Sequence, residues 1–173
     1  MHQTISLSGI PVTNPVSVMA SFYANLTGAA LSRLMPLPDK IDDNPDFTLP
    51  LWTSFDPLKV RKILPWVMVI QRVGPGPEGH VIKLEGNRIV ELSGVNSMGK
   101  SLAEAFDAEV AAIKWQELDQ VSKSRSVSYT RSPVPRDNRS FIEIFRGCFP
   151  FCDEEGVVSR FLVVVAPVRD GLI

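Results

Sequence analysis

The chain of 173 residues is poor in cysteine and histidine, and this scarcity excludes several kinds of site. It contains two of each, and Cys148 and Cys152 lie four positions apart with no second pair to complete a zinc site. The CxxC spacing of redox motifs is also absent. On a strand, residues four apart point to the same face, so we expect two buried, small hydrophobic side chains in a reducing compartment. No metal site is expected.

An excess of one charge and long hydrophobic runs are also missing. The 18 basic and 19 acidic residues give a net charge of -1, which provides no general attraction to nucleic acid or to an anionic membrane. No apolar run approaches the roughly 20 residues that span a bilayer. The first residues lack a basic region followed by a continuous apolar core, so a secretory signal is not expected. We therefore expect a cytoplasmic protein with neither nucleic acid nor a membrane as partner. Its 45% hydrophobic residues are typical of a compact soluble domain.

The first 32 residues contain no Asp, Glu, Lys or Arg. Within them, Asn14-Pro15 is a typical helix start, and apolar residues at helical spacing predict a helix over 15–27 that ends at Gly28. With no basic polar face, this helix is expected to dock on its own domain or on a second subunit. We expect that removing residues 1–32 would abolish dimerisation and leave the domain folded.

A proline-rich connector separates this helix from the rest of the chain. Residues 1–54 are expected to form the N-terminal helix and an acidic connector, and residues 55–173 the main domain. Four aspartates lie in the connector without the ordered oxygen ligands of an EF-hand, so a solvated loop is favoured over a calcium site. These aspartates are Asp39, Asp42, Asp43 and Asp46.

The middle of the chain predicts a hairpin followed by helices. A β-branched segment at 64–73, a glycine- and proline-rich turn at 74–79 and a second segment at 80–84 indicate two antiparallel strands. A short helix over 87–92 ends at Gly94. Ser101 and Glu104 form a capping box for a helix over 102–122. Its main apolar stripe is Leu102, Phe106, Val110, Ile113 and Val121, and its second stripe, Ala111, Trp115 and Leu118, implies another partner.

The end of the chain predicts three further strands, at 126–134, 140–149 and 159–168. The last is the richest in β-branched residues and is expected to be central and buried on both faces, whereas the turn at 153–156 is expected to be exposed. A basic cluster is either part of a solvated hairpin or an anion-binding patch. Its members are Lys123, Arg125, Arg131, Arg136 and Arg139.

This order of elements predicts an α+β fold, a five-stranded antiparallel sheet with helices on one face plus an N-terminal helix. Four motifs, in this order and spacing, resemble the PAS domain family, and in particular the single-domain PAS proteins of alphaproteobacteria. The resemblance covers about residues 55–168. The motifs are Asp56-Pro57, Leu64-Pro65, Gly86-Asn87-Arg88-Ile89-Val90-Glu91-Leu92-Ser93-Gly94 and Gly99-Lys100-Ser101-Leu102.

The resemblance implies a sensor or ligand-binding module with a pocket between the sheet and the helices, and dimerisation through the N-terminal helix. It does not name a cofactor. The Cys motif of flavin photoreceptors has no counterpart at 96–100, where the chain reads Asn-Ser-Met-Gly-Lys. The long helix over 102–122 has no histidine to serve as the axial ligand of a haem.

Enzymatic alternatives have little support in the sequence. A nucleophile would have to be Cys148 or Cys152 paired with His80, and no neighbouring residue activates either thiol. Carboxylate pairs such as Glu85 with Glu91, or Glu104 with Glu143, arise by chance in a chain with 19 acidic residues. No catalytic residue is predicted. Glu143 and Arg146 either contribute to a pocket or face solvent.

We therefore expect a non-catalytic sensory or regulatory PAS module. It binds a small apolar or amphipathic ligand or acts through dimer contacts, and a separate protein provides the output. The alternative is a protein-interaction scaffold whose pocket is filled by side chains. The residues predicted to line the pocket are Met68, Ile89, Leu92, Trp115, Tyr129 and Ile144.

Overall fold

The computed structural model describes residues 2–27 and 49–169 and is built on one antiparallel sheet of six strands. In spatial order the strands are β1-β4-β5-β6-β2-β3. Their bounds are β1 Gln3–Thr4, β2 Val67–Arg72, β3 His80–Glu85, β4 Ser128–Pro133, β5 Glu143–Cys152 and β6 Val158–Pro167.

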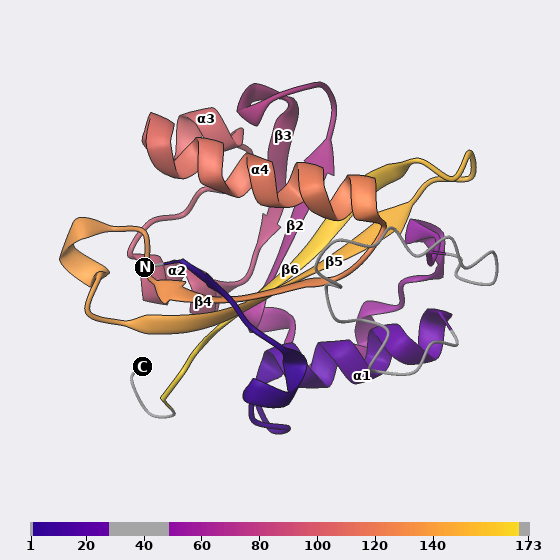
Figure 1. Ribbon diagram of the computed structural model, residues 1–173, viewed down its shortest axis with the longest axis horizontal. Coiled ribbons are helices and arrows are strands. Elements are labelled where there is room, and N and C mark those ends of the chain that lie inside the picture. Colours follow the sequence, from indigo (N-terminus) through magenta and orange to yellow (C-terminus); the bar gives the residue numbers. More distant parts are fainter. Residues whose placement is uncertain (1, 28–48, 170–173) are drawn as a thin grey trace.

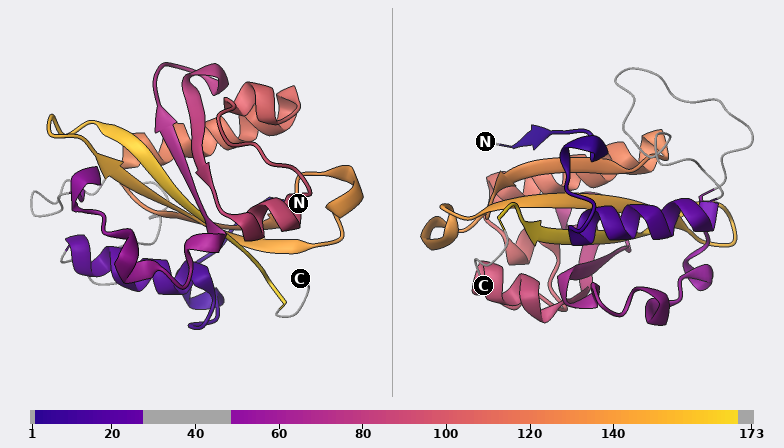
Figure 2. Two further views of the ribbon diagram at one scale, coloured as in Figure 1. Left: turned by 180° about the vertical axis from the view of Figure 1, so that it is seen from behind. Right: turned by 90° about the horizontal axis from the view of Figure 1, so that it is seen from below.

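Helices cover both faces of this sheet (Figure 1). One face carries α2 (Asn87–Ser93), α3 (Leu102–Ala105) and α4 (Ala108–Ser124), and the opposite face carries α1 (Pro15–Thr27). Short 3-10 helices between residues 52 and 66 run beside α1, as the two views of Figure 2 show. Each face has its own hydrophobic core, which we call the α4 core and the α1 core.

The alternation of side chains along the central strands divides the residues between these two cores, because successive residues of a strand point to opposite faces. The α4 core receives Ile144, Cys148, Phe161, Val163 and Val165. The α1 core receives Phe145, Phe149, Phe151, Leu162 and Val164. Strand β6 is thus central and buried on both faces, as the sequence predicted.

The expected α+β architecture is confirmed, with two additions. Strand β1 pairs with β4 and adds a sixth strand, a pairing too short to give a sequence signal. Helix α1 lies on the face opposite α4, so helices lie on both faces. The predicted bounds of α1 are correct. Asn14 starts the helix as expected, because its Oδ1 accepts from the Val16 N–H at 3.0 Å. Gly28 and the aspartate-rich connector lie outside the described residues.

The predicted helix over 102–122 is two helices. The capping box of Ser101 and Glu104 is present, but α3 ends at Ala105, and Phe106 follows in an extended conformation. Asp107 then caps α4 by accepting from the Val110 N–H at 2.9 Å. A second cap inside one apolar pattern restarts the helix at a new angle, which the periodicity alone does not reveal.

This break changes which side of α4 faces the sheet. The predicted main stripe is wrong at two positions, because Ile113 is 42% exposed and Val110 is partly exposed. Ala111 and Leu118 of the second stripe are buried in the α4 core, together with Leu102 and Val121 of the first. No additional partner is therefore needed to cover that stripe.

The predicted strand at 64–73 also begins later than expected, because residues Leu64–Trp66 form a 3-10 helix with Pro65 in its first turn. Similarly, the strand expected from 140 begins at Glu143 and extends to Cys152. The short helix is confirmed as α2, which ends at Gly94 in the left-handed conformation (φ 74°). That conformation favours glycine.

Gly147 on β5 allows α1 to approach the sheet closely. A Cβ atom at this position would lie 2.9 Å from Val16 Cγ1 of α1 and 2.8 Å from the Phe149 ring. Both distances are shorter than a van der Waals contact between carbon atoms. Glycine is therefore required here for the packing of α1.

Both cysteines are free and buried, and both belong to the α4 core, as expected for two small hydrophobic side chains on one face of a strand. Within the described parts of the chain, no helix is both long and apolar enough to cross a membrane.

Candidate functional site

A small cavity lies inside the α4 core, between α2, α4 and the strands β2, β5 and β6, with a volume of about 50 Å³. One part of its wall is apolar and is formed by Met68, Ile89, Leu92, Phe106, Val134, Pro135, Ile144 and Val165. The other part is polar and is formed by Glu85, Ser93, Ser97, Lys114, Arg136 and Arg146. We call this space the inner cavity.

The structure brings together four of the six residues that the sequence proposed for a pocket. Met68, Ile89, Leu92 and Ile144 line the inner cavity from β2, α2 and β5. Their side chains are almost fully buried. Trp115 and Tyr129 lie elsewhere.

Tyr129 belongs to the α1 core, on the opposite side of the sheet from the inner cavity. It is fully buried, faces Gly147 across β4 and β5, and has no hydrogen-bond partner for its hydroxyl among described residues. Burial raises the pKa of this hydroxyl. The sequence showed that Tyr129 was on a strand but not which face it occupied, so its assignment to the pocket was wrong.

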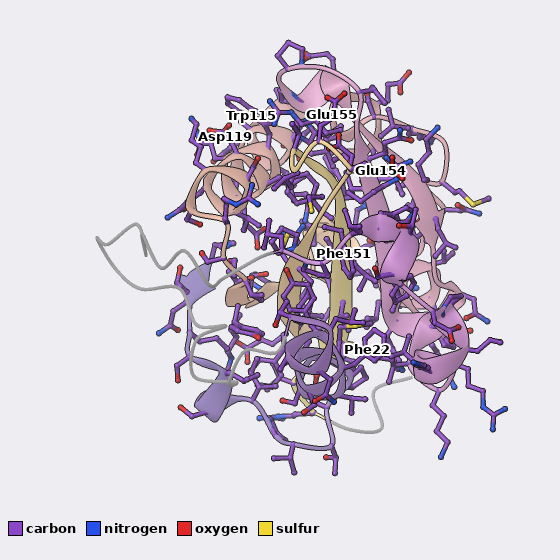
Figure 3. The ribbon with its side chains drawn as sticks, turned by 90° about the vertical axis from the view of Figure 1, so that its right-hand side faces the viewer. Phe22, Trp115, Asp119, Phe151, Glu154 and Glu155 are labelled. Atoms are coloured by element: carbon purple, nitrogen blue, oxygen red, sulfur yellow. The ribbon has the colours of Figure 1, made fainter. Side chains whose placement is uncertain are left out.

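Trp115 packs against the α4 core while remaining partly exposed. It does not line the inner cavity. Figure 3 shows it with Asp119 on α4, across the sheet from Phe22 of α1. Trp115 is therefore an edge residue of this core.

A buried ion pair lies beside the inner cavity. Arg146 of β5, 5% exposed, pairs through Nη1 with Oε2 of Glu117 of α4, 9% exposed. The Ser128 hydroxyl donates to the other carboxylate oxygen of Glu117 at 3.2 Å. The pair joins the helix to the sheet. Arg146 is thus a pocket residue, whereas Glu143 is exposed and pairs with Arg131 at 2.6 Å.

Two further cations approach the cavity around the ring of Phe106. The ammonium of Lys114 and the guanidinium of Arg136 each lie 4.8 Å from the ring centroid. Arg136 donates from Nη2 to the Ala105 carbonyl at 2.9 Å, but its buried Nε has no partner among described residues. Burial, followed by the positive charges of Arg146 and Arg136, holds the pKa of Lys114 well below its usual value.

Glu85 is the carboxylate in the cavity wall. It accepts from the Ser97 N–H at 2.6 Å. Burial raises the pKa of Glu85, and the bond from Ser97 opposes that shift. Glu85 thus has a structural partner of its own.

A second, more open pocket of about 160 Å³ adjoins the inner cavity. We call it the outer pocket. The two spaces share Lys114, Pro135 and Arg146 in their walls, and the outer pocket adds His2 and Ile113 among others. Partial burial and the charges of Arg146 and Lys114 lower the pKa of His2.

A groove of about 800 Å³ lies on the other side of the sheet. Trp52, Phe55 and Leu64 line it together with Val67 and Val69 of β2. It is continuous with the α1 core, to which these side chains belong. No pattern in the sequence predicted this groove.

The side chains considered for catalysis make structural contacts. Among described residues, no hydrogen bond joins either cysteine to an imidazole, and His80 Nδ1 lies 2.8 Å from the Gly76 carbonyl oxygen. In the proposed carboxylate pairs, Glu91 binds Arg88 and Glu104 caps α3. The described residues contain no group of three or more His, Cys, Asp or Glu side chains that could hold a metal ion.

The five residues of the basic cluster do not form one patch. Lys123 pairs with Asp119, Arg125 donates to the Gly156 carbonyl and Arg131 pairs with Glu143. Arg136 lines the inner cavity, while Arg139 lies near Gly94. The solvated alternative therefore describes the cluster better than a common anion-binding patch does.

No protein-family model matches the chain, and no curated protein matches its sequence. Comparison with solved structures finds the PAS domain of BvgS from Bordetella pertussis, with 17% identity and a TM-score of 0.49 over 68% of this chain and 90% of that one. A sensory box sensor histidine kinase from Vibrio cholerae has 16% identity and a TM-score of 0.45 over 65% and 88%.

An RNA-binding light-oxygen-voltage receptor gives 10% identity and a TM-score of 0.48 over 89% of this chain. This chain spans 54% of that receptor's length. The structures found thus include a PAS domain, the family that the sequence motifs resemble.

Proposed function

We propose that this chain is a non-catalytic sensory or regulatory module of the PAS type. It acts in the cytoplasm, binds a small ligand in the inner cavity and passes the signal through dimer or partner contacts to a separate output protein. The observation that supports ligand binding is the cavity itself, where an apolar wall meets a few convergent polar groups. The two free, buried cysteines are consistent with a reducing compartment.

The size of the inner cavity limits the ligand. Its volume of about 50 Å³ is well below the roughly 300–1,000 Å³ of most small-molecule sites. Only a molecule of a few non-hydrogen atoms fits, unless part of it extends past Lys114 and Arg146 into the outer pocket. A ligand as large as a haem or a flavin does not fit this arrangement.

Native mass spectrometry of the protein purified from its own host tests the proposal. We expect a bound small molecule at one equivalent per chain, lost when the cavity is filled by Leu92→Trp. The matched control is Leu84→Trp, because Leu84 is 44% exposed and lies outside the inner cavity. A clean apoprotein from several growth conditions would contradict ligand binding.

The second candidate is an interaction scaffold whose pocket is closed by side chains. The small volume of the inner cavity is the observation that favours it. In this case Leu92→Trp would leave partner binding unchanged, while changes in the groove beside Trp52 would weaken it. Pull-down from host lysate with Leu92→Trp and with Leu84→Trp, whose position lines the groove, separates the candidates.

We also propose dimerisation through α1. Its apolar stripe is already buried against the sheet, so the contact would use the outward residues Val18, Ser21 and Asn25. Val18→Asp should then convert the dimer to a monomer in light-scattering measurements. Val12→Asp, at a more exposed position before the helix, is the control. A monomeric wild-type protein would contradict the dimer.

A further inference from the structure

Lys114 and Arg146 stand at the boundary between the two spaces of the candidate site. Both side chains line the inner cavity and the outer pocket. A molecule that enters from outside meets them before it reaches the apolar wall formed by residues such as Met68, Ile89 and Leu92. Their chemistry therefore decides what the inner cavity accepts.

Basic side chains outnumber carboxylates at this boundary. Lys114, Arg136 and Arg146 approach the cavity, against the carboxylates of Glu85 and Glu117. Glu117 is engaged by Arg146, and Glu85 accepts from the Ser97 N–H. Among the ion pairs formed by described residues, none includes Lys114 or Arg136.

Hydrogen-bond donors also remain available at this boundary. Arg146 uses Nη1 for Glu117, and no described residue accepts from its other nitrogens. Lys114 has the face of Phe106 as a neighbour but no hydrogen-bond acceptor among described residues. Lys114 is partly exposed and Arg146 is 5% exposed, so an anion that contacts both side chains would receive charge-assisted hydrogen bonds from each of them.

The remaining wall defines the rest of the ligand. A guanidinium presents paired N–H groups that match the planar carboxylate. Behind it, the cavity is apolar and holds only about 50 Å³, which suits a short aliphatic chain. A phosphate or sulfate ion would bring no group to occupy that apolar space.

We propose that Lys114 and Arg146 bind the carboxylate of a short-chain carboxylic acid, whose aliphatic chain occupies the apolar part of the inner cavity. This inference rests on the proposed ligand-binding function and names the chemical class of the ligand. The guanidinium of Arg136 lies beside the same Phe106 ring and adds positive charge nearby. Lys114 and Arg146 distinguish the acid from neutral molecules of the same size.

The test is a titration of the full-length protein, followed by amide chemical shifts, with sodium butyrate, butyramide and sodium phosphate at constant ionic strength. Butyramide has the same chain length without the charge. We expect saturable shifts around β5 and α4 with butyrate, and binding at least tenfold weaker with butyramide. Lys114→Met should weaken butyrate binding at least tenfold, whereas Lys123→Met, on the exposed side of the same helix, should not.

Equal affinity for butyramide and butyrate would overturn the inference, as would binding of phosphate alone or butyrate binding that survives Lys114→Met. The comparison of butyrate with butyramide uses the wild-type protein. It therefore tests the inference even if Lys114→Met fails to fold. A neutral molecule retained by the host-purified protein would leave the sensory proposal standing while overturning this one. A protein that retains no molecule and binds none of the three probes would overturn both.

Discussion

The buried pair of Glu117 and Arg146 is the residue contact whose loss should cost most stability. Glu117→Gln leaves the guanidinium of Arg146 buried without a counter-charge, and such losses cost about 3–5 kcal/mol. We expect the free energy of unfolding, measured by urea denaturation, to fall by about 3–5 kcal/mol. A decrease below about 1 kcal/mol would show that water already solvates the charge of the Arg146 guanidinium.

The matched control is Glu143→Gln at the exposed pair with Arg131. Both side chains of that pair are solvated, so the free energy of unfolding should not change measurably. The double variant Glu117→Gln with Arg146→Met should recover stability relative to Glu117→Gln alone, because it removes the buried charge.

Burial should also suppress the reactivity of the cysteines. Burial raises the pKa of the Cys148 thiol to about 12, with the nearby Arg146 opposing the shift. The reactive thiolate is therefore scarce at about pH 8, and Cys152 is buried as well. We expect a thiol-specific disulfide reagent to modify neither cysteine in the folded protein and both in guanidinium chloride. Rapid modification without denaturant would contradict this.

The apolar residues of the inner cavity were easier to predict from the sequence than the charged ones, and for Arg146 the sequence left a pocket and solvent as alternatives. Met68, Ile89, Leu92 and Ile144 were found because apolar residues on regular elements are usually buried. Lys114 and Glu117 were missed because a charged residue on a helix normally faces solvent. Which charges are buried depends on how α4 is rotated over the sheet, and Asp107 sets that rotation by restarting the helix.

At the scale of the element, the cap at Asp107 gives a prediction. Asp107→Ala removes the acceptor for the Val110 N–H and should lower the free energy of unfolding by about 1 kcal/mol. Asp107→Asn keeps a side-chain oxygen at the same place and should retain most of the stability. Urea denaturation of both variants checks this. Equal losses would show that the negative charge matters more than the cap.

The elements themselves were largely predictable because their signals are local. The start of α1 at Asn14-Pro15, the end of α2 at Gly94 and the Ser101 capping box each depend on a few neighbouring residues. Two features depend on distant contacts and were missed. These are the pairing of β1 with β4 and the face of the sheet that each strand residue occupies.

For the whole molecule, α1 is part of the fold and not an appendage. Val16, Met19 and Tyr23 are fully buried, and the Tyr23 hydroxyl donates to the Pro150 carbonyl at 2.6 Å. Each large apolar side chain contributes about 1.5–3 kcal/mol by burial, against a total stability of about 5–15 kcal/mol for a typical domain. We therefore expect that protein lacking residues 1–32 does not stay folded, contrary to the expectation from the sequence.

A protein that begins at residue 28 should lose its cooperative unfolding transition and bind a hydrophobic dye, since the α1 core would face solvent. Circular dichroism during thermal unfolding and dye fluorescence measure the two effects. Tyr23→Phe in the complete chain is the milder comparison and should keep the transition. A sharp transition at an unchanged temperature in the truncated protein would contradict a structural role for α1.

The close approach at Gly147 has a consequence for how a signal could cross the sheet. Arg146 and Gly147 are consecutive, yet the first faces the candidate site and the second touches Val16 of α1. A rigid strand turns both together, so a twist of β5 that follows a change at Arg146 also moves the surface on which α1 rests. With no side chain at Gly147 to absorb that movement, the two faces of the molecule are one peptide bond apart.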